Sequence, residues 1–171
     1  AAGCRPNTVN AWLAGLRSFF SWAVGNRLLI TDPTSGVKGP RRAGTNKKHL
    51  RQPLTDSEVR RVLARPDPTT PRGKRDSALL ALMAFTAIRT IEAHRADLGD
   101  LRTEGGRQVL ALQGKGRRDK DEIAVIPAPA EGPLYDWLSV RGGQPGPLFC
   151  SLSPRSHGGR LSLRAIRGLV K

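Results

Sequence analysis

Two short segments of the sequence carry residues that could act on a phosphate group. In residues 86–92 (TAIRTIE), Arg89 directly follows an apolar stretch, and Glu92 stands three positions further on. The planar guanidinium of an arginine can hold two phosphate oxygens at once. An arginine and an acid three residues apart on a helix can also form a purely structural ion pair. Taken alone, this segment favours the structural pair.

The second segment places a lysine between two glycines. Gly114-Lys115-Gly116 opens the basic run GKGRRDK, which lies between β-branched and apolar runs at 108–113 and 121–127. This pattern predicts a β-hairpin with a basic tip. The glycines would let the backbone approach a phosphate closely, and a lysine can act as a general acid. Glycines also simply make turns, so the motif alone does not distinguish a site from a turn.

The charge of the chain indicates a polyanionic partner. Its 171 residues include 29 Lys and Arg against 14 Asp and Glu, which gives a net charge of +15. No acid precedes Asp32, none lies between Asp32 and Asp56, and none follows Asp136. Long stretches of single-sign charge suit a phosphate backbone. Nucleic acid is favoured over a membrane, because no run approaches the roughly twenty apolar residues of a membrane span.

Neither a metal nor a cofactor is indicated. The two cysteines, Cys4 and Cys150, form no Cys-x-x-Cys pair, and the three histidines are scattered. Zinc sites need ligands of these types at close spacing. We therefore expect a reduced, intracellular protein without structural zinc.

The N-terminal part of the chain predicts one amphipathic helix followed by a linker. Apolar residues at helical spacing run over residues 7–25, and Gly25-Asn26 is a plausible C-terminal stop. Residues 33–53 combine Gly, Pro and basic residues, which is typical of an interdomain linker. A single helix cannot bury its own apolar face, so we expect partner helices from a segment that precedes this sequence.

The rest of the chain predicts a mixture of helices and strands. Residues 55–58 (TDSE) match a capping box that begins a helix. After a Pro-rich loop at 66–71, the almost wholly apolar residues 76–86 predict a central core helix. A short strand near 98–101 would complete a small sheet with the hairpin.

Two further helices are expected toward the end of the chain. One contains Trp137, and we expect Tyr135, the only tyrosine, to pack on the same apolar face. The other begins near Ser162 and points Arg164 and Arg167 outward. A tyrosine in a packed position is not expected to act as a nucleophile.

Taken together and in this order, the segments resemble the tyrosine recombinases, or phage integrases. TVNAWLAGLRSFFSWAVGNRLLITDPTSGVKGP resembles the last part of the family's helical core-binding domain, and LTDSEVRRVLA resembles the start of its catalytic domain. RDSALLALMAFTAIRTIEAHRADLGDL is similar to the box around the first catalytic arginine. LALQGKGRRDKDEIAVIP is similar to the hairpin with the catalytic lysine, and GGRLSLRAIRGLVK to the helix that leads to the second catalytic box.

The resemblance implies a role for several residues. Arg89 matches the first catalytic arginine, which holds the scissile phosphate, and Lys115 matches the hairpin lysine, a candidate general acid for the departing 5′ oxygen. Glu92 matches a buried acidic partner that supports the site. In the family a tyrosine attacks phosphorus to form a 3′-phosphotyrosyl link, so neither ATP nor metal is implied. Ala87 stands where the family usually has Gly, which bears on how Arg89 is presented.

The resemblance also implies duplex DNA as the partner. Basic residues on the first helix, the linker, the hairpin tip and the last helix would contact it: Arg17, Lys38, Arg41, Arg42, Lys47, Lys48, Arg117, Arg118, Arg164 and Arg167. Intact family members act as homo-oligomers, tetramers on paired sites. A bacterial or phage-encoded cytoplasmic protein, associated with the nucleoid and without a membrane anchor, is expected.

The expected fold is α+β and mainly helical, with a small antiparallel sheet. Residues 1–40 would be the C-terminal part of a helical core-binding (SAM-like) domain, 41–52 a basic linker, and 53–171 a partial catalytic domain. The family's second box, His-x-x-Arg, and its tyrosine are not found at their usual places. His157-Gly-Gly-Arg160 fits the box only by its letters, because it stands in a Gly-rich turn. We therefore expect a fragment that lacks the N-terminal helices and the C-terminal motifs and cannot complete strand cleavage by itself.

Two other functions fit the charge. A non-catalytic DNA-binding remnant or regulator would bind DNA in a salt-sensitive way without covalent adducts. A basic RNA-binding protein would prefer single-stranded or A-form RNA to duplex DNA. The second alternative leaves Arg89 and Lys115 unexplained.

Overall fold

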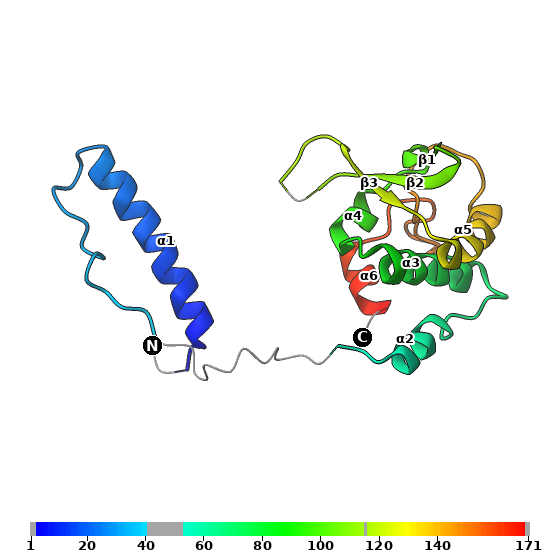
Figure 1. The fold of residues 1–171 in the computed structure, drawn as a ribbon, viewed down its shortest axis with the longest axis horizontal. Coiled ribbons are helices and arrows are strands. Elements are labelled where there is room, and N and C mark those ends of the chain that lie inside the picture. Colours follow the sequence, from blue (N-terminus) through cyan, green and yellow to red (C-terminus); the bar gives the residue numbers. More distant parts are fainter. Residues whose placement is uncertain (1–2, 41–52, 115, 170–171) are drawn as a thin grey trace. The chain divides into compact units, whose positions relative to one another are not determined.

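The computed structural model describes residues 3–40, 53–114 and 116–169. The chain divides into two compact units, Ala1–Gln52 and Pro53–Lys171. Helices and a three-stranded antiparallel sheet make up the fold, so the predicted α+β class is confirmed. The elements of the second unit (Figure 1) are α2 (Asp56–Leu63), α3 (Pro71–Thr86), α4 (Thr90–Arg95), the 3-10 turn η1 (Leu98–Asp100), β1 (Leu101–Glu104), β2 (Arg107–Leu112), β3 (Glu122–Val125), α5 (Ala128–Arg141) and α6 (Leu163–Leu169).

The first unit consists of helix α1 (Pro6–Gly25) and the turns that follow it. The predicted bounds and the stop at Asn26 are confirmed, although the left-handed residue after the helix is Arg27, with φ 57°. The predicted linker is wrong in its first part. Residues 33–40 return to α1, where Arg17 donates to the carbonyl of Val37 at 2.5 Å and Thr34 is buried. Residues 41–52 lie outside the described ranges.

Helices α2 and α3 begin where their caps dictate. The capping box at Thr55 is confirmed, since the Thr55 backbone N–H donates to Glu58 at 2.8 Å and its hydroxyl accepts from the Glu58 N–H. Helix α3 begins at Pro71, inside the expected loop, because the Thr70 hydroxyl caps Gly73 and a proline is tolerated in the first helical turn. Its apolar run forms the centre of the core, as predicted.

The core of the second unit lies between α3, α5 and the sheet (Figure 1). Trp137 of α5 is fully buried, and its indole N–H donates to the carbonyl of Leu148 at 2.9 Å. The expectation for Tyr135 is wrong: its side chain is half exposed. Successive helical residues differ by about 100° around the axis, so Tyr135 and Trp137, two positions apart, point in nearly opposite directions.

The sheet has the order β1-β2-β3, and β2 is its buried centre. Leu110 pairs with Leu101 on one side and with Ala124 on the other. The predicted hairpin between β2 and β3 is confirmed. The strand expected near 98–101 is instead the turn η1 followed by β1, because Asp100 caps the turn by accepting from the Asp97 N–H at 2.7 Å.

Candidate active site

Arg89 is presented by a sharp break between α3 and α4. The chain leaves α3 through Ala87, which adopts the left-handed conformation with φ 55° and ψ 22°. Ile88 is then buried, and Arg89 is extended as the N-cap of α4. A left-handed conformation is costly for a residue with a Cβ and costs little for glycine. This cost explains why glycine would suit position 87 better than alanine.

The buried carboxylate of Glu92 accepts two hydrogen bonds from Arg89. One carboxylate oxygen accepts from the Arg89 backbone N–H and the other from its Nη1, both at 2.7 Å. The Glu92 side chain is 3% exposed, whereas that of Arg89 is 65% exposed. This hydrogen bond and the Glu92 charge raise the pKa of the Arg89 guanidinium above its usual value. The arginine is therefore fixed at its base while most of its donors face outward.

The tip of the hairpin is organised by polar contacts around Gln113. The Gln113 amide donates to the carbonyls of Arg117 at 3.0 Å and Arg118 at 2.9 Å. A Cβ on Gly114 would lie 2.6 Å from Glu122 Oε1, so a larger residue there would displace the half-exposed side chain of Glu122. Lys115 itself lies outside the described residues.

A carboxylate at the base of the hairpin acts electrostatically on Arg89. The carboxylate of Glu122, the first residue of β3, adds to the rise in the pKa of Arg89. Glu122 also pairs with Arg117 Nε at 3.3 Å. Glu122, at the start of β3, thus lies within electrostatic range of Arg89. Nothing in the sequence pattern singled out Glu122.

Some of the predicted DNA-binding residues already form contacts within the chain, and others do not. Arg17 holds the loop at Val37, and Arg117 pairs within the hairpin with Asp121 at 2.5 Å and with Glu122. All six described members are exposed, and the side chains of Lys38, Arg118, Arg164 and Arg167 form no hydrogen bond or ion pair with another described residue. The remaining four lie outside the described residues: Arg41, Arg42, Lys47 and Lys48.

In the segment His157-Gly-Gly-Arg160, the arginine makes structural contacts. Arg160 donates to the carbonyls of His94 at 2.7 Å and Ala96 at 3.1 Å, and to Asp97 at 2.5 Å. His157 is exposed in the turn before it. The guanidinium thus ties this turn to the end of α4.

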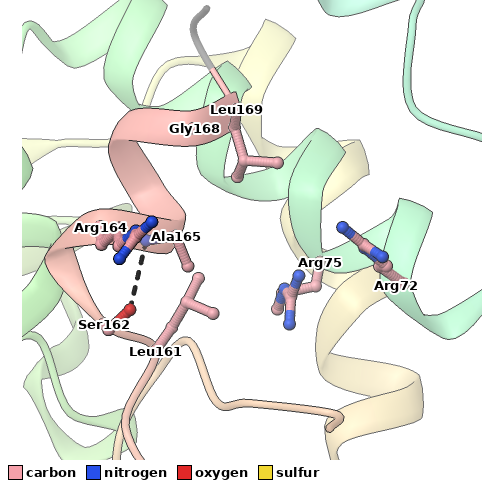
Figure 2. A pocket seen from close by; sticks show the side chains of 8 residues that line it. All are labelled: Arg72, Arg75, Leu161, Ser162, Arg164, Ala165, Gly168 and Leu169. Atoms are coloured by element: carbon pink, nitrogen blue, oxygen red, sulfur yellow. Dashed lines mark hydrogen bonds between the residues drawn. The ribbon is translucent and has the colours of Figure 1, made fainter.

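A hollow of about 440 Å³ lies between the start of α3 and α6. Figure 2 shows Arg164 beside Ser162 on one side of Arg75 and Arg72 on the other side. The buried Arg75 is already engaged, because its Nε donates to Asp76 at 2.8 Å and its Nη1 to the carbonyl of Cys150. Neither Arg89 nor the hairpin lines this hollow, so it is separate from the candidate site.

The described ranges contain neither a cluster of metal ligands nor a membrane-spanning helix. No group of three or more His, Cys, Asp or Glu side chains there is arranged to hold a metal ion. No helix within those ranges has the length and apolar character needed to cross a membrane.

Several known proteins are similar to this chain. A putative integrase/recombinase of Sinorhizobium fredii is 37% identical over 160 residues, which cover 85% of the chain and 53% of the relative. A tyrosine recombinase of Synechocystis is 30% identical over 100% of the chain and 53% of the relative. The tyrosine recombinase XerC of Actinobacillus pleuropneumoniae is 33% identical over 96% of the chain and 51% of the relative. The chain thus spans about half the length of these relatives.

One solved structure is similar to part of this chain. The crystal structure of XerA recombinase matches with a TM-score of 0.48 and 21% identity, over 68% of this chain and 41% of that one. No family model matches the chain.

Proposed function

Because the chain belongs to the tyrosine recombinase family, we propose that it supplies Arg89 and Lys115 to an active site that cuts and rejoins duplex DNA. The reaction would be site-specific recombination or integration through a phosphotyrosyl intermediate. Cleavage breaks the bond from phosphorus to the 5′ oxygen as the tyrosine oxygen bonds to phosphorus. Rejoining reverses these changes, so the energy of the phosphodiester is conserved.

Each residue would have a distinct task. Arg89 would hold the non-bridging oxygens and stabilise the charge that develops on them in the transition state. Lys115 would give a proton to the departing 5′ oxygen. Glu92 would keep Arg89 in place without touching DNA. The tyrosine would come from outside these 171 residues, since Tyr135 is the only tyrosine and lies on the helix α5.

The observation that carries the proposal is the asymmetry of the Arg89–Glu92 pair. In an ordinary surface ion pair both charged groups stay in water. Here the acid is 3% exposed and the arginine 65% exposed. Preorganised donors that face outward are what a phosphoryl-transfer site requires. The neighbouring hairpin, with its Gly114-Lys115-Gly116 tip, supports the same conclusion.

We further propose the setting in which this site works. Residues 1–40 would belong to a helical core-binding domain, 41–52 to a basic linker and 53–171 to a partial catalytic domain. Duplex DNA would contact exposed cations such as Arg118 and Arg167, and the intact protein would act as a homo-oligomer on paired sites. A cytoplasmic, nucleoid-associated location fits that task.

The test uses the complete gene product and a nicked duplex substrate that traps the covalent complex. Arg89→Ala should lower the rate of adduct formation by about 10²–10³-fold, the usual cost of removing one oxyanion donor. Arg102→Ala is the matched control, because Arg102 is a half-exposed arginine of β1 that pairs only with Glu104 among the described residues. Its rate should stay close to that of the wild type.

The competing functions give different results in the same experiment. DNA binding that falls steeply with salt, without any covalent adduct, would support a non-catalytic DNA-binding protein. Tighter binding to single-stranded or A-form RNA than to duplex DNA would support an RNA-binding protein. Equal adduct rates for the wild type and Arg89→Ala would contradict the role of Arg89.

A further inference from the structure

A lysine of the hairpin tip reaches out of the hairpin to the far end of α4. Lys120 Nζ donates to the carbonyl of Arg95 at 3.2 Å and to Asp97 Oδ2 at 2.9 Å. It also donates to the carboxylate of Asp100. All three acceptors lie at the end of α4 or in the turn that follows. The ammonium has three N–H donors, so this arrangement satisfies it fully.

A second cation completes the cluster from a different segment. Arg160 donates to the other oxygen of Asp97, Oδ1, at 2.5 Å, and to two carbonyls beside it. Asp97 therefore bridges Lys120, 23 positions away, and Arg160, 63 positions away. Three segments distant in the sequence are held at one carboxylate.

The cluster is sheltered enough to matter energetically. The side chain of Lys120 is 28% exposed and that of Asp100 is 14% exposed. Burial opposes the charge on Asp97, yet hydrogen bonds from Lys120 and Arg160 lower the pKa of its carboxyl below the usual value. Burial likewise opposes the charge on Lys120, while its bonds to Asp100 and Asp97 raise its pKa. Charged hydrogen bonds of this kind contribute more than exposed ion pairs do.

Among the described residues 113–121, Lys120 is the one whose side chain forms hydrogen bonds outside the hairpin. Gln113 bonds to carbonyls within the tip, and Arg117 pairs with Asp121 and Glu122. Without Lys120, these local contacts would keep the shape of the tip but not its place relative to α4.

The other end of the anchoring helix carries Arg89. Helix α4 has six residues, with Arg89 as its N-cap and Arg95 as its last residue. At about 1.5 Å per residue, the helix separates Arg89 from the Lys120 anchor by only about 9 Å. Lys115 lies five positions before Lys120 in the same tip. One short helix therefore links the predicted phosphate-binding arginine to the anchor point of the hairpin tip.

We propose that Lys120 is a positioning residue that locks the hairpin tip to α4 and thereby places Lys115 relative to Arg89. The hydrogen bonds of Lys120 form the lock, and its effect on catalysis rests on the proposed function. Lys120 touches neither substrate nor reacting atoms in this role.

The first test measures the lock without any DNA, by hydrogen exchange on the 171-residue chain. Lys120→Met keeps the length of the side chain but removes its donors. Exchange in the 113–122 segment should become roughly tenfold faster, the effect of losing charged hydrogen bonds on local opening. Lys74→Gln is the matched control, since Lys74 is half-buried in α3 and its side chain bonds to no described residue. Unchanged exchange in Lys120→Met, or an equal rise in Lys74→Gln, would overturn the lock.

The second test measures catalysis in the complete gene product. Lys120→Met should slow covalent adduct formation by about 10–100-fold, the effect of displacing a catalytic group by about 1 Å. A substrate with sulfur at the bridging 5′ position needs no proton to release its leaving group. On that substrate the defect should shrink to within roughly threefold, and Lys120→Arg should restore most of the rate on the ordinary substrate. The Kd for DNA should stay within roughly threefold of the wild type.

The outcomes separate this inference from the proposed function. An equal defect on both substrates would show that Lys120 does not act through Lys115, and would overturn the positioning role. If the wild type forms no adduct with DNA, the proposed function fails. The exchange experiment then decides by itself whether Lys120 locks the tip to α4.

Discussion

Large apolar side chains meet different surroundings in the two units. In the second unit, Trp137 and Leu79 have no exposed surface and Phe149 only 2%. In the first, Trp12 is 59% exposed and Phe19 56%. The second unit encloses its own core, whereas α1 is held mainly by the turns that return to it. The candidate site thus lies in the unit whose fold is determined by its own packing.

The same contrast holds for polar groups. Within the described ranges, no buried side-chain nitrogen or oxygen lacks a hydrogen-bond partner. The second unit satisfies buried charges by pairing, as Glu92 does with Arg89 and Asp76 with Arg75. The first unit relies on exposed bonds such as that from Asn10 to the carbonyl of Pro40. Preorganisation of a charged site requires the buried pairing seen in the second unit, because water would otherwise weaken each interaction.

The largest difference between the units should appear when one tryptophan is removed from each. Trp137→Ala should lower the free energy of unfolding by about 3–5 kcal/mol, because it leaves a cavity and an unpaired carbonyl at Leu148. Trp12→Ala should change it by less than about 0.5 kcal/mol. Urea denaturation followed by far-UV circular dichroism measures both. A loss below about 1 kcal/mol for Trp137→Ala would contradict the closed core of the second unit.

A smaller loss is expected when the buried acid of the site is neutralised. Glu92→Gln should cost about 1–3 kcal/mol, because it removes the negative charge and replaces one of the two accepting oxygens with an NH2 donor that faces another donor. Glu104→Gln, on the exposed strand β1, should cost less than about 0.5 kcal/mol. The measurement is again urea denaturation. Equal effects of the two substitutions would mean that the Arg89–Glu92 pair is no better organised than a surface pair.

Acid should weaken the second unit through Asp97. Burial disfavours its charge, but the hydrogen bonds from Lys120 and Arg160 prevail and lower the pKa of the carboxyl in the folded state. Asp97 therefore adds stability above its unfolded pKa of about 3.9, and this contribution is lost as the pH falls through the folded value. Unfolding free energies measured between neutral pH and about pH 3 should fall less steeply in Asp97→Asn. A slope identical to that of the wild type, with Asp119→Asn as the control, would exclude this contribution.

The smallest effect should have the same sign in both units. Among the described residues, each unit has one non-glycine residue in the left-handed conformation, Arg27 in the first and Ala87 in the second. Arg27→Gly and Ala87→Gly should each stabilise the chain by about 0.5–1 kcal/mol. Ala64→Gly should not, because Ala64 is right-handed, with φ −82°. Thermal melts compare the three, and a destabilised Ala87→Gly would show that the break after α3 does not depend on this strain.

Local rules were enough for much of the fold. The capping box at Thr55, the apolar helix α3 and the hairpin around GKGRRDK depend on neighbours within a few residues, and all three are confirmed. The errors arose where distant contacts decided the outcome. Residues 33–40 have the composition of a linker but pack on α1, and Tyr135 is exposed because the core takes Trp137.

The sequence by itself determined the family and the class of fold. It also determined the pairing of Arg89 with Glu92, since residues three positions apart are neighbours on a helix. Only the tertiary structure decided that Glu92 is buried while Arg89 is exposed, and that Glu122 lies within electrostatic reach of the arginine. It alone also joined Lys120 and Arg160 at Asp97. Spacing along the chain carries no information on such pairs, because the packing of the whole unit brings their charges together.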